Sequence, residues 1–160
     1  MRIKLRLSVA LPVAATALVL ASGVPLVAHH AFGGEFDANR PVLLKGAITK
    51  VELVNPHAWI HLAAKEVTLA GEKRDLKGQT EEWAVEGGTP NTLLRRGITR
   101  DSLKVGTEIV VDGYQTRDHT LTRANGRNIT FVDGRKLFMG SSGTGAPKDG
   151  ADSSEPPPGH

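Results

Sequence analysis

Two adjacent histidines, His29 and His30, are the first residues in this 160-residue sequence whose types and position suggest chemistry. If the chain is cut after Ala28, His29 becomes the amino-terminal residue and offers its α-amine and its ring Nδ1 to one metal ion. Nitrogen donors of this kind suit copper, nickel or zinc. A further imidazole would complete a three-nitrogen clamp, and the candidates for it are His30, His57, His61 and His119. The alternative is that the two histidines begin a flexible arm with no fixed partner.

A second candidate site lies in residues 55–61. His57, Trp59 and His61 alternate there with apolar residues, so a strand would place all three on one face. Positions four apart on a strand are about 13 Å apart, so His57 and His61 can share an ion only if the strand bends. The segment is either a ligand-binding surface or a strand whose outer face packs Trp59 against residues 65–80, which are predicted to be a polar loop or a ragged hairpin.

A third candidate site surrounds Gly87-Gly88, which follows a predicted strand and precedes a predicted helix. The N–H groups at the start of that helix could hold an anion. The glycines match no phosphate-binding motif, because no Gly-Lys-Ser/Thr sequence follows them. A simple turn from strand to helix is therefore the favoured alternative. Together, the second and third sites give the predicted ligand-binding residues His57, Trp59, Trp83, Glu86, Asn91, Arg95 and Arg96.

The sequence lacks the common signatures of catalysis. It has no evident pair of carboxylates for acid–base work, no Gly-x-Ser-x-Gly elbow, no His-Glu-x-x-His and no dinucleotide fingerprint. It also has no cysteine, which excludes thiolate metal sites, a catalytic cysteine and thioredoxin-like chemistry. These absences favour a binding module over an enzyme.

Residues 1–28 are typical of a secretory signal peptide. Arg2, Lys4 and Arg6 are followed by an apolar stretch over residues 7–20. A proline interrupts that stretch and no charged stop-transfer run follows, so we expect a cleaved leader and no stable membrane anchor. The predicted location of the mature protein is the periplasm.

Cleavage of the leader changes the charge balance. The whole sequence has 20 Lys and Arg residues against 17 Asp and Glu residues. The leader holds three of the basic residues and none of the acidic ones, which leaves 17 of each sign in the mature chain. A formally neutral chain argues against a nucleic-acid partner.

The mature chain divides into one domain and a tail. Residues 140–160 are rich in glycine, serine and proline and hold almost no bulky apolar residue, so we expect a disordered tail there. Residues 29–139 are then a single domain.

Strand patterns dominate this domain. Apolar residues alternate over residues 42–53, and their phase shifts by one within the run, which predicts a β-bulge in a long bent strand. Thr89-Pro90 is typical of a helix start, and Gly97 of a helix end. Further strands are predicted at residues 58–64, 82–86, 107–114, 128–132 and 136–138, with a hairpin turn at Asp133-Gly134.

This order of elements predicts a mainly β fold. The closest match is a small OB-fold-like Greek-key barrel of five to six strands with one short helix. An open β-sandwich is the alternative.

Several sequence blocks occur in order through the mature domain. They are His29-His30-Ala31-Phe32, Glu35-Phe36-Asp37, Asn55-Pro56-His57-Ala58-Trp59, Trp83-Ala84-Val85-Glu86-Gly87-Gly88, Leu94-Arg95-Arg96-Gly97, Asp101-Ser102-Leu103 with Gly106, and Asp133-Gly134-Arg135. In these blocks the sequence resembles domain-of-unknown-function family 6152, a family of small exported bacterial proteins. It departs from the family at Ala31, where serine is common, and in its longer loop at residues 65–80. The resemblance implies an exported β-domain and supplies no activity.

The leading functional hypothesis is a non-enzymatic periplasmic module that binds a ligand or a metal through the mature amino-terminal histidine. One alternative is a copper-dependent accessory or redox enzyme that uses the same histidines. Another is a structural protein that binds a periplasmic partner and uses its tail as a tether. The predicted ion is copper or another transition metal, and the predicted metal ligands are His29, His30, His57 and His61.

Overall fold

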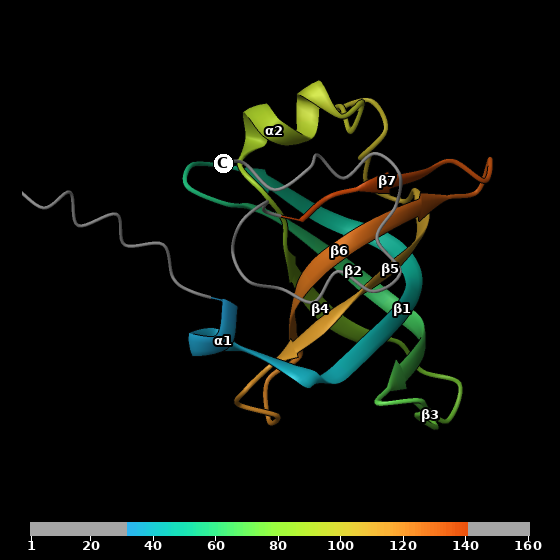
Figure 1. Cartoon of the computed structure of the whole chain (residues 1–160). Coiled ribbons are helices and arrows are strands. Elements are labelled where there is room, and N and C mark those ends of the chain that lie inside the picture. The colour runs from blue at the N-terminus through green and yellow to red at the C-terminus, as the bar shows by residue number, and fades with distance from the viewer. Residues whose placement is uncertain (1–31, 141–160) are drawn as a thin grey trace, which may run out of the picture.

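The computed structural model describes residues 32–140 of the chain (Figure 1). The predicted leader, His29, His30 and residues 141–160 lie outside the described residues. The elements in chain order are α1 (Phe32–Glu35), β1 (Phe36–Leu53), β2 (Ala58–Leu69), β3 (Glu72–Lys73), β4 (Glu81–Glu86), α2 (Pro90–Arg95), β5 (Glu108–Thr116), β6 (Arg123–Phe131) and β7 (Lys136–Phe138).

All seven strands belong to one sheet, so the prediction of a mainly β fold is confirmed. The hydrogen-bonded order is β1-β5-β6-β4-β2-β3, with β7 paired to β6 and an additional pairing between β1 and β2. The pairing of β4 with β6 is parallel and the others are antiparallel. The strand β1 is 18 residues long. It pairs with β5 over residues 36–47 and with β2 over residues 42–53, so residues 42–47 have a partner strand on each edge.

The core forms on the side of the sheet where alternate residues are apolar. Leu44 of β1, Ile60 and Leu62 of β2, and Trp83 and Val85 of β4 are fully buried. Burial of one such aliphatic side chain contributes about 1.5–3 kcal/mol. The alternation predicted for β1 and β2 is therefore the pattern that places these side chains inside.

Glycines allow β1 and β5 to approach their partner strands at irregular points. The register between β1 and β2 shifts at Lys45/Gly46 and again at Ile48/Lys50, which confirms the predicted bulge. A Cβ atom on Gly46 would lie 2.1 Å from the carbonyl oxygen of Ala63. Because real Cβ atoms do not approach backbone this closely, only glycine fits at this position.

We expect Gly46→Ala to lower the free energy of unfolding by about 3 kcal/mol or more, because the obstacle is backbone that cannot rotate away. Urea denaturation measures the change. The matched control is Gly34→Ala, since a Cβ on Gly34 would meet no heavy atom within 4 Å. Equal stability of the two variants would contradict this account of the bulge.

The turns and helix ends predicted from the sequence are found in most places. The Thr89 hydroxyl oxygen accepts a hydrogen bond from the Thr92 N–H, as expected of a helix cap, and Gly97 follows α2 with a φ of 83°. The hairpin between β6 and β7 is also confirmed. Within residues 65–80, which were predicted as a loop or ragged hairpin, β2 continues to Leu69 and pairs with the short strand β3.

Two elements differ from the prediction. The helix α1 was not expected, because Gly33-Gly34 make up half of it and glycine is a poor helix former. The strand β6 begins at Arg123, five residues before the predicted start at residue 128. Among residues 32–140, neither helix is long and apolar enough to cross a membrane.

A half-buried carboxyl group lies beside the irregularity in β5. The register between β5 and β6 shifts at Asp112/Gly113, and the Asn128 side-chain amide donates to Asp112 Oδ2 at 2.9 Å. Burial raises the pKa of Asp112, although the Asn128 hydrogen bond and the nearby Lys136 act in the opposite direction. The fold therefore holds the proton of this carboxyl more tightly than the unfolded chain does.

Because folding raises the pKa of Asp112, the direction in which stability changes with pH can be predicted. The contribution of protonated Asp112 is fully present below the pKa of the unfolded chain and is lost as the pH rises through the pKa of the folded protein. Asp112→Asn cannot ionise and still offers Asn128 an acceptor oxygen. We therefore expect this variant to be more stable than the wild type at pH 7, with the difference shrinking toward pH ~3, near the pKa of an unperturbed aspartate. Thermal unfolding across this pH range measures it, and a variant that is less stable at pH 7 would contradict it.

Candidate functional site

The candidate residues of β2 lie on the face of the strand that points away from the core. Trp59 and His61 are half-buried, whereas Ala58, Ile60 and Leu62 between and beside them are fully buried. His57 immediately precedes the strand. The predicted division of this segment into two faces is therefore confirmed.

His57 is held against the end of β4. The backbone N–H of Gly87 donates to the carbonyl oxygen of Ala58 at 2.8 Å, and the N–H of Ala58 donates to Gly88 at 2.9 Å. This pairing brings His57 Nδ1 to 3.3 Å from the Gly87 carbonyl oxygen and to 3.2 Å from Glu86 Oε1. Glu86 is only 7% exposed, and the His57 side chain is 30% exposed.

The two neighbours of His57 Nδ1 determine where the neutral ring carries its proton. The Gly87 carbonyl oxygen can only accept a hydrogen bond, so a neutral His57 ring in contact with it donates from Nδ1. The lone pair of neutral His57 then lies on Nε2. A carboxylate or carbonyl behind one ring nitrogen is the usual support for a histidine that binds a metal through the other.

We expect neutral His57 to be the Nδ1-protonated tautomer. Long-range ¹H–¹⁵N NMR correlations of the imidazole measure this directly. In Glu86→Ala one of the two acceptors is lost, so the preference for this tautomer should weaken while the Gly87 carbonyl retains part of it. A neutral ring protonated on Nε2 in the unsubstituted protein would contradict the geometry.

Trp59 lies next to Glu86 across the β2–β4 pairing and is joined to a residue that the sequence did not indicate. The guanidinium of Arg123 lies 4.6 Å from the centre of a Trp59 ring, a cation–π contact. Arg123 also pairs with Glu35 at 2.8 Å. Trp59 thus contacts Arg123, and Arg123 connects it to α1.

The helix α1 places the start of the described chain on this outer side of the sheet. Phe32 is buried and packs edge-on against Tyr114 of β5, with ring centres 5.4 Å apart. It also contacts Phe36, with ring centres 5.8 Å apart. The chain then leads directly from α1 into β1 (Figure 1).

Two other predicted residues lie in different surroundings. His61 faces β1, where its Nε2 is 4.0 Å from Glu52 Oε2, and this nitrogen is buried with no hydrogen-bond partner within residues 32–140. Trp83 is fully buried in the core, and its indole N–H donates to Glu81 Oε2 at 2.9 Å. Trp83 therefore has no exposed surface to offer a ligand.

The predicted residues of α2 divide in the same way. Asn91 and Arg95 are exposed on the helix. Arg96 donates to the carbonyl oxygen of Gly140 at 2.6 Å and lies 4.5 Å from the ring centre of Phe138. Arg96 thus fastens the chain that follows β7.

The Gly87-Gly88 pair has a packing role. A Cβ on Gly87 would lie 3.2 Å from the Met139 carbonyl oxygen, and one on Gly88 would lie 3.0 Å from the carbonyl oxygen of Gly140. The glycines let the chain after β7 approach the end of β4, beside His57. Close approach of backbone, rather than a special turn, explains them.

Two residues of the site have no signal in the sequence. Glu35 and Arg123 contact the predicted site through Trp59, as described above. His119, which the sequence offered as a possible metal ligand, instead has its Nε2 3.1 Å from Asp37 Oδ2. Neither pair could be found from the sequence, because about 80 to 90 residues separate the partners.

Within residues 32–140, no group of three or more histidine, aspartate or glutamate side chains is close enough to hold a metal ion. His57 with Glu86 supplies at most two donors. A site with three protein ligands on this surface would therefore need a ligand from outside residues 32–140, and the predicted ligands His29 and His30 lie outside the described residues.

These features describe a small mainly β domain in which His57 lies against Glu86 and the Gly87 carbonyl at the end of β4. The chain matches the family model described as "Family of unknown function (DUF6152)" over residues 17–125. This protein therefore belongs to the DUF6152 family, as the sequence blocks predicted. Neither a curated protein nor a solved structure shows significant similarity to it.

Proposed function

We propose that this protein is an exported metal-binding module in which His57 and the mature amino-terminal residue His29 bind one transition-metal ion. The observation that carries the proposal is the placement of His57. Glu86 and the Gly87 carbonyl occupy its Nδ1, which leaves Nε2 as a ligand with a fixed direction. Export is supported by the leader-like pattern of residues 1–28.

The strand register supports the nearness of the two ligands. Tyr114 pairs with Asn125, which pairs with Glu86, so the three residues form one row across β5, β6 and β4. Two strand spacings separate Tyr114 from Glu86, or about 10 Å. Phe32 packs on Tyr114, and three residues of chain beyond it span up to about 10 Å, so the amine of His29 is within covalent reach of the His57–Glu86 pair.

The donor atoms favour copper. An amino-terminal histidine supplies its amine and ring nitrogen, and His57 supplies a third nitrogen. Nitrogen-rich sets of this kind hold Cu(II) more tightly than the other divalent ions of its row. His30 offers a fourth nitrogen from the adjacent position.

We also propose that the sheet closes as an OB-fold-like barrel. The order β1-β5-β6-β4-β2 returns to β1 through the additional β1–β2 pairing. The parallel β4–β6 pair and the position of α2 between β4 and β5 in the chain support the same five-stranded Greek-key arrangement. Such closure would leave few exposed strand edges and would keep the outer row of Tyr114, Asn125 and Glu86 in fixed register.

The metal proposal is tested with protein processed to begin at His29. We expect titration calorimetry with Cu(II) to give a dissociation constant of micromolar or tighter, about −8 kcal/mol. His57→Ala should weaken binding by about 10-fold or more. A variant with one extra alanine before His29 should weaken it as well, because the α-amine is then no longer beside the imidazole.

The matched control is His61→Ala. His61 belongs to the same strand face but turns toward Glu52, so its loss should leave the affinity unchanged. Binding that is weaker than micromolar, or that is indifferent to both His57 and the amino terminus, would overturn the proposal. Native mass spectrometry of the secreted protein reports the true first residue and any retained ion together.

A further inference from the structure

We propose that a cavity beside the β2–β3 hairpin is a binding site for a small organic anion that carries a carboxylate or phosphate group. The cavity has a volume of about 360 Å³ and is lined by Arg40, Leu69, Ala70, Glu72, Lys73 and Arg74. Arg40 belongs to β1, and the other five residues run from the end of β2 to just beyond β3. The proposal uses none of the residues assigned to the metal site and does not depend on that assignment.

An irregularity in β1 brings Arg40 to this cavity. Residues 37–40 of β1 lie opposite the single residue Gln115 of β5, because the register shifts just before Pro41. The N–H of Ala70 donates to the carbonyl oxygen of Pro41 at 2.8 Å, which fixes the turn of the hairpin against β1. Arg40 therefore lies where the irregular part of β1 meets the hairpin.

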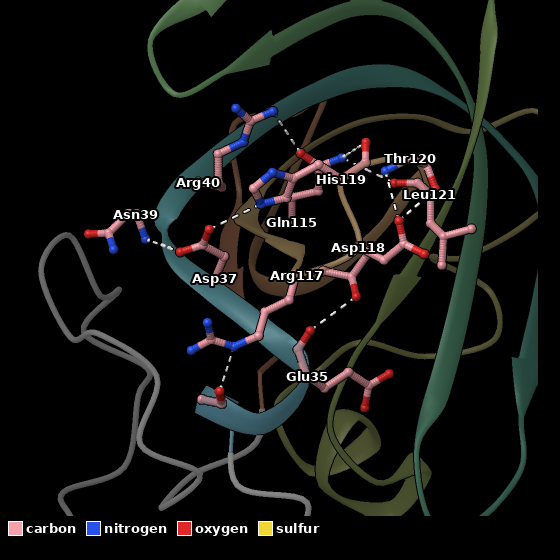
Figure 2. Close-up of polar contacts among 12 residues, drawn as sticks. Glu35, Asp37, Asn39, Arg40, Gln115, Arg117, Asp118, His119, Thr120 and Leu121 are labelled. Atoms are coloured by element: carbon pink, nitrogen blue, oxygen red, sulfur yellow. Dashed lines mark hydrogen bonds and ion pairs between the residues drawn. The ribbon is translucent and has the colours of Figure 1, made fainter.

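A buried glutamine holds the guanidinium in place. Arg40 Nη2 donates to Gln115 Oε1 at 3.3 Å (Figure 2). Gln115 is 2% exposed, and its side-chain amide nitrogen donates to the carbonyl oxygens of His119 at 3.3 Å and Leu121 at 3.1 Å. Because carbonyl oxygens engage the nitrogen of this amide, its oxygen is the atom that faces Arg40. Gln115 thus positions the Arg40 side chain before any ligand arrives.

The charge of Arg40 has no carboxylate partner among residues 32–140. The hydrogen bond to Gln115 is the only polar contact of the Arg40 side chain within these residues. The side chain is half-buried, and its Nε is buried without a hydrogen-bond partner. Moving a cation partly out of water costs free energy unless an anion pairs with it. An anion bound at Arg40 would supply the missing partner.

Two further cations line the cavity. Lys73 Nζ lies 3.5 Å from Glu66 Oε2, but Lys45 Nζ lies 3.0 Å from the other oxygen of Glu66, so one carboxylate serves two ammonium groups. Arg74 pairs with a carboxylate of β4 at 3.1 Å. The lining thus has three cationic side chains against one acidic side chain, that of Glu72.

The lining and the size of the cavity define the class of ligand. Guanidinium groups bind carboxylates and phosphates through pairs of parallel N–H···O bonds. Small-molecule sites in proteins range upward from about 300 Å³, so this cavity suits a ligand of a few carbon atoms. Leu69 and Ala70 give it an apolar wall. A small dicarboxylate and a small phosphomonoester both have the required chemistry.

The test titrates the mature protein, in buffer without added metal, with succinate and with glycerol phosphate. We expect the NMR signal of the Arg40 Nε–H to shift with a dissociation constant of about 1 mM or tighter for at least one of the two anions. The anion that binds more tightly identifies the group that the site prefers. Succinamide has the shape of succinate without its charges, so it should cause no shift.

Substitutions separate this site from a general attraction of anions. Arg40→Gln should weaken binding by about 10-fold or more, because it removes charge-assisted hydrogen bonds. Glu72→Gln should strengthen binding by about 2-fold to 5-fold, because it removes an exposed charge that repels the anion. The matched control is Arg100→Gln, which makes the same change of charge at an exposed arginine outside the cavity lining. It should leave the affinity unchanged.

The proposal is overturned if neither anion shifts the Arg40 signal, or if Arg40→Gln and Arg100→Gln weaken binding equally. If Arg40→Gln loses its fold by circular dichroism, Glu72→Gln decides the question, since Glu72 is exposed on the hairpin and its loss does not disturb the core. An affinity that is not increased in Glu72→Gln would then overturn the proposal. None of these results bears on copper binding, so the two proposals stand or fall separately.

Discussion

The structure depends on one strand that pairs with two others. β1 pairs with β5 over residues 36–47 and with β2 over residues 42–53, so its middle residues have a partner on each edge. The register shifts at Lys45/Gly46 and Ile48/Lys50, and the absence of a side chain on Gly46 lets the strand lie against Ala63. Without this bulge β1 could not follow both partners, because a regular strand cannot change its direction so sharply.

The pairing of β1 also decides what lies on the outer side of the sheet. Its first residues carry α1 to Tyr114, and its last residues lead through a short turn to His57. Between these points, β6 presents polar residues that are nevertheless buried, among them Asn125 and Asn128. The outer side is therefore a polar surface to which both ends of β1 contribute. It differs from an ordinary solvated face because several of its polar side chains are buried, and buried polar groups need hydrogen-bond partners.

The sequence predicts the parts of this fold that follow from local patterning. Alternation found β1 and β2, capping residues found α2, and the Asp133-Gly134 turn found the last hairpin. The start of β6 was missed because Arg123, Asn125 and Gly126 do not look like strand residues, since they are placed by contacts rather than by propensity.

The candidate site could be predicted only in part for a related reason. His57, Trp59 and Glu86 were found because they are chemically distinctive residues in short blocks. Glu35 and Arg123 are ordinary charged residues, and they matter because the fold brings them together across 88 positions of the chain. Such long-range pairs have no local signal, whereas a histidine beside a strand end does.

The different surroundings of the only two tryptophans have a spectroscopic consequence. Trp83 is sealed in the core, and Trp59 lies half-buried under the guanidinium of Arg123, which itself holds Glu35. Their fluorescence emission should therefore resolve into a blue-shifted component from Trp83 and a red-shifted component from Trp59. The protein thus carries its own optical label at each location, so that changes around Trp59 can be followed without attaching a dye, while Trp83 reports on the core.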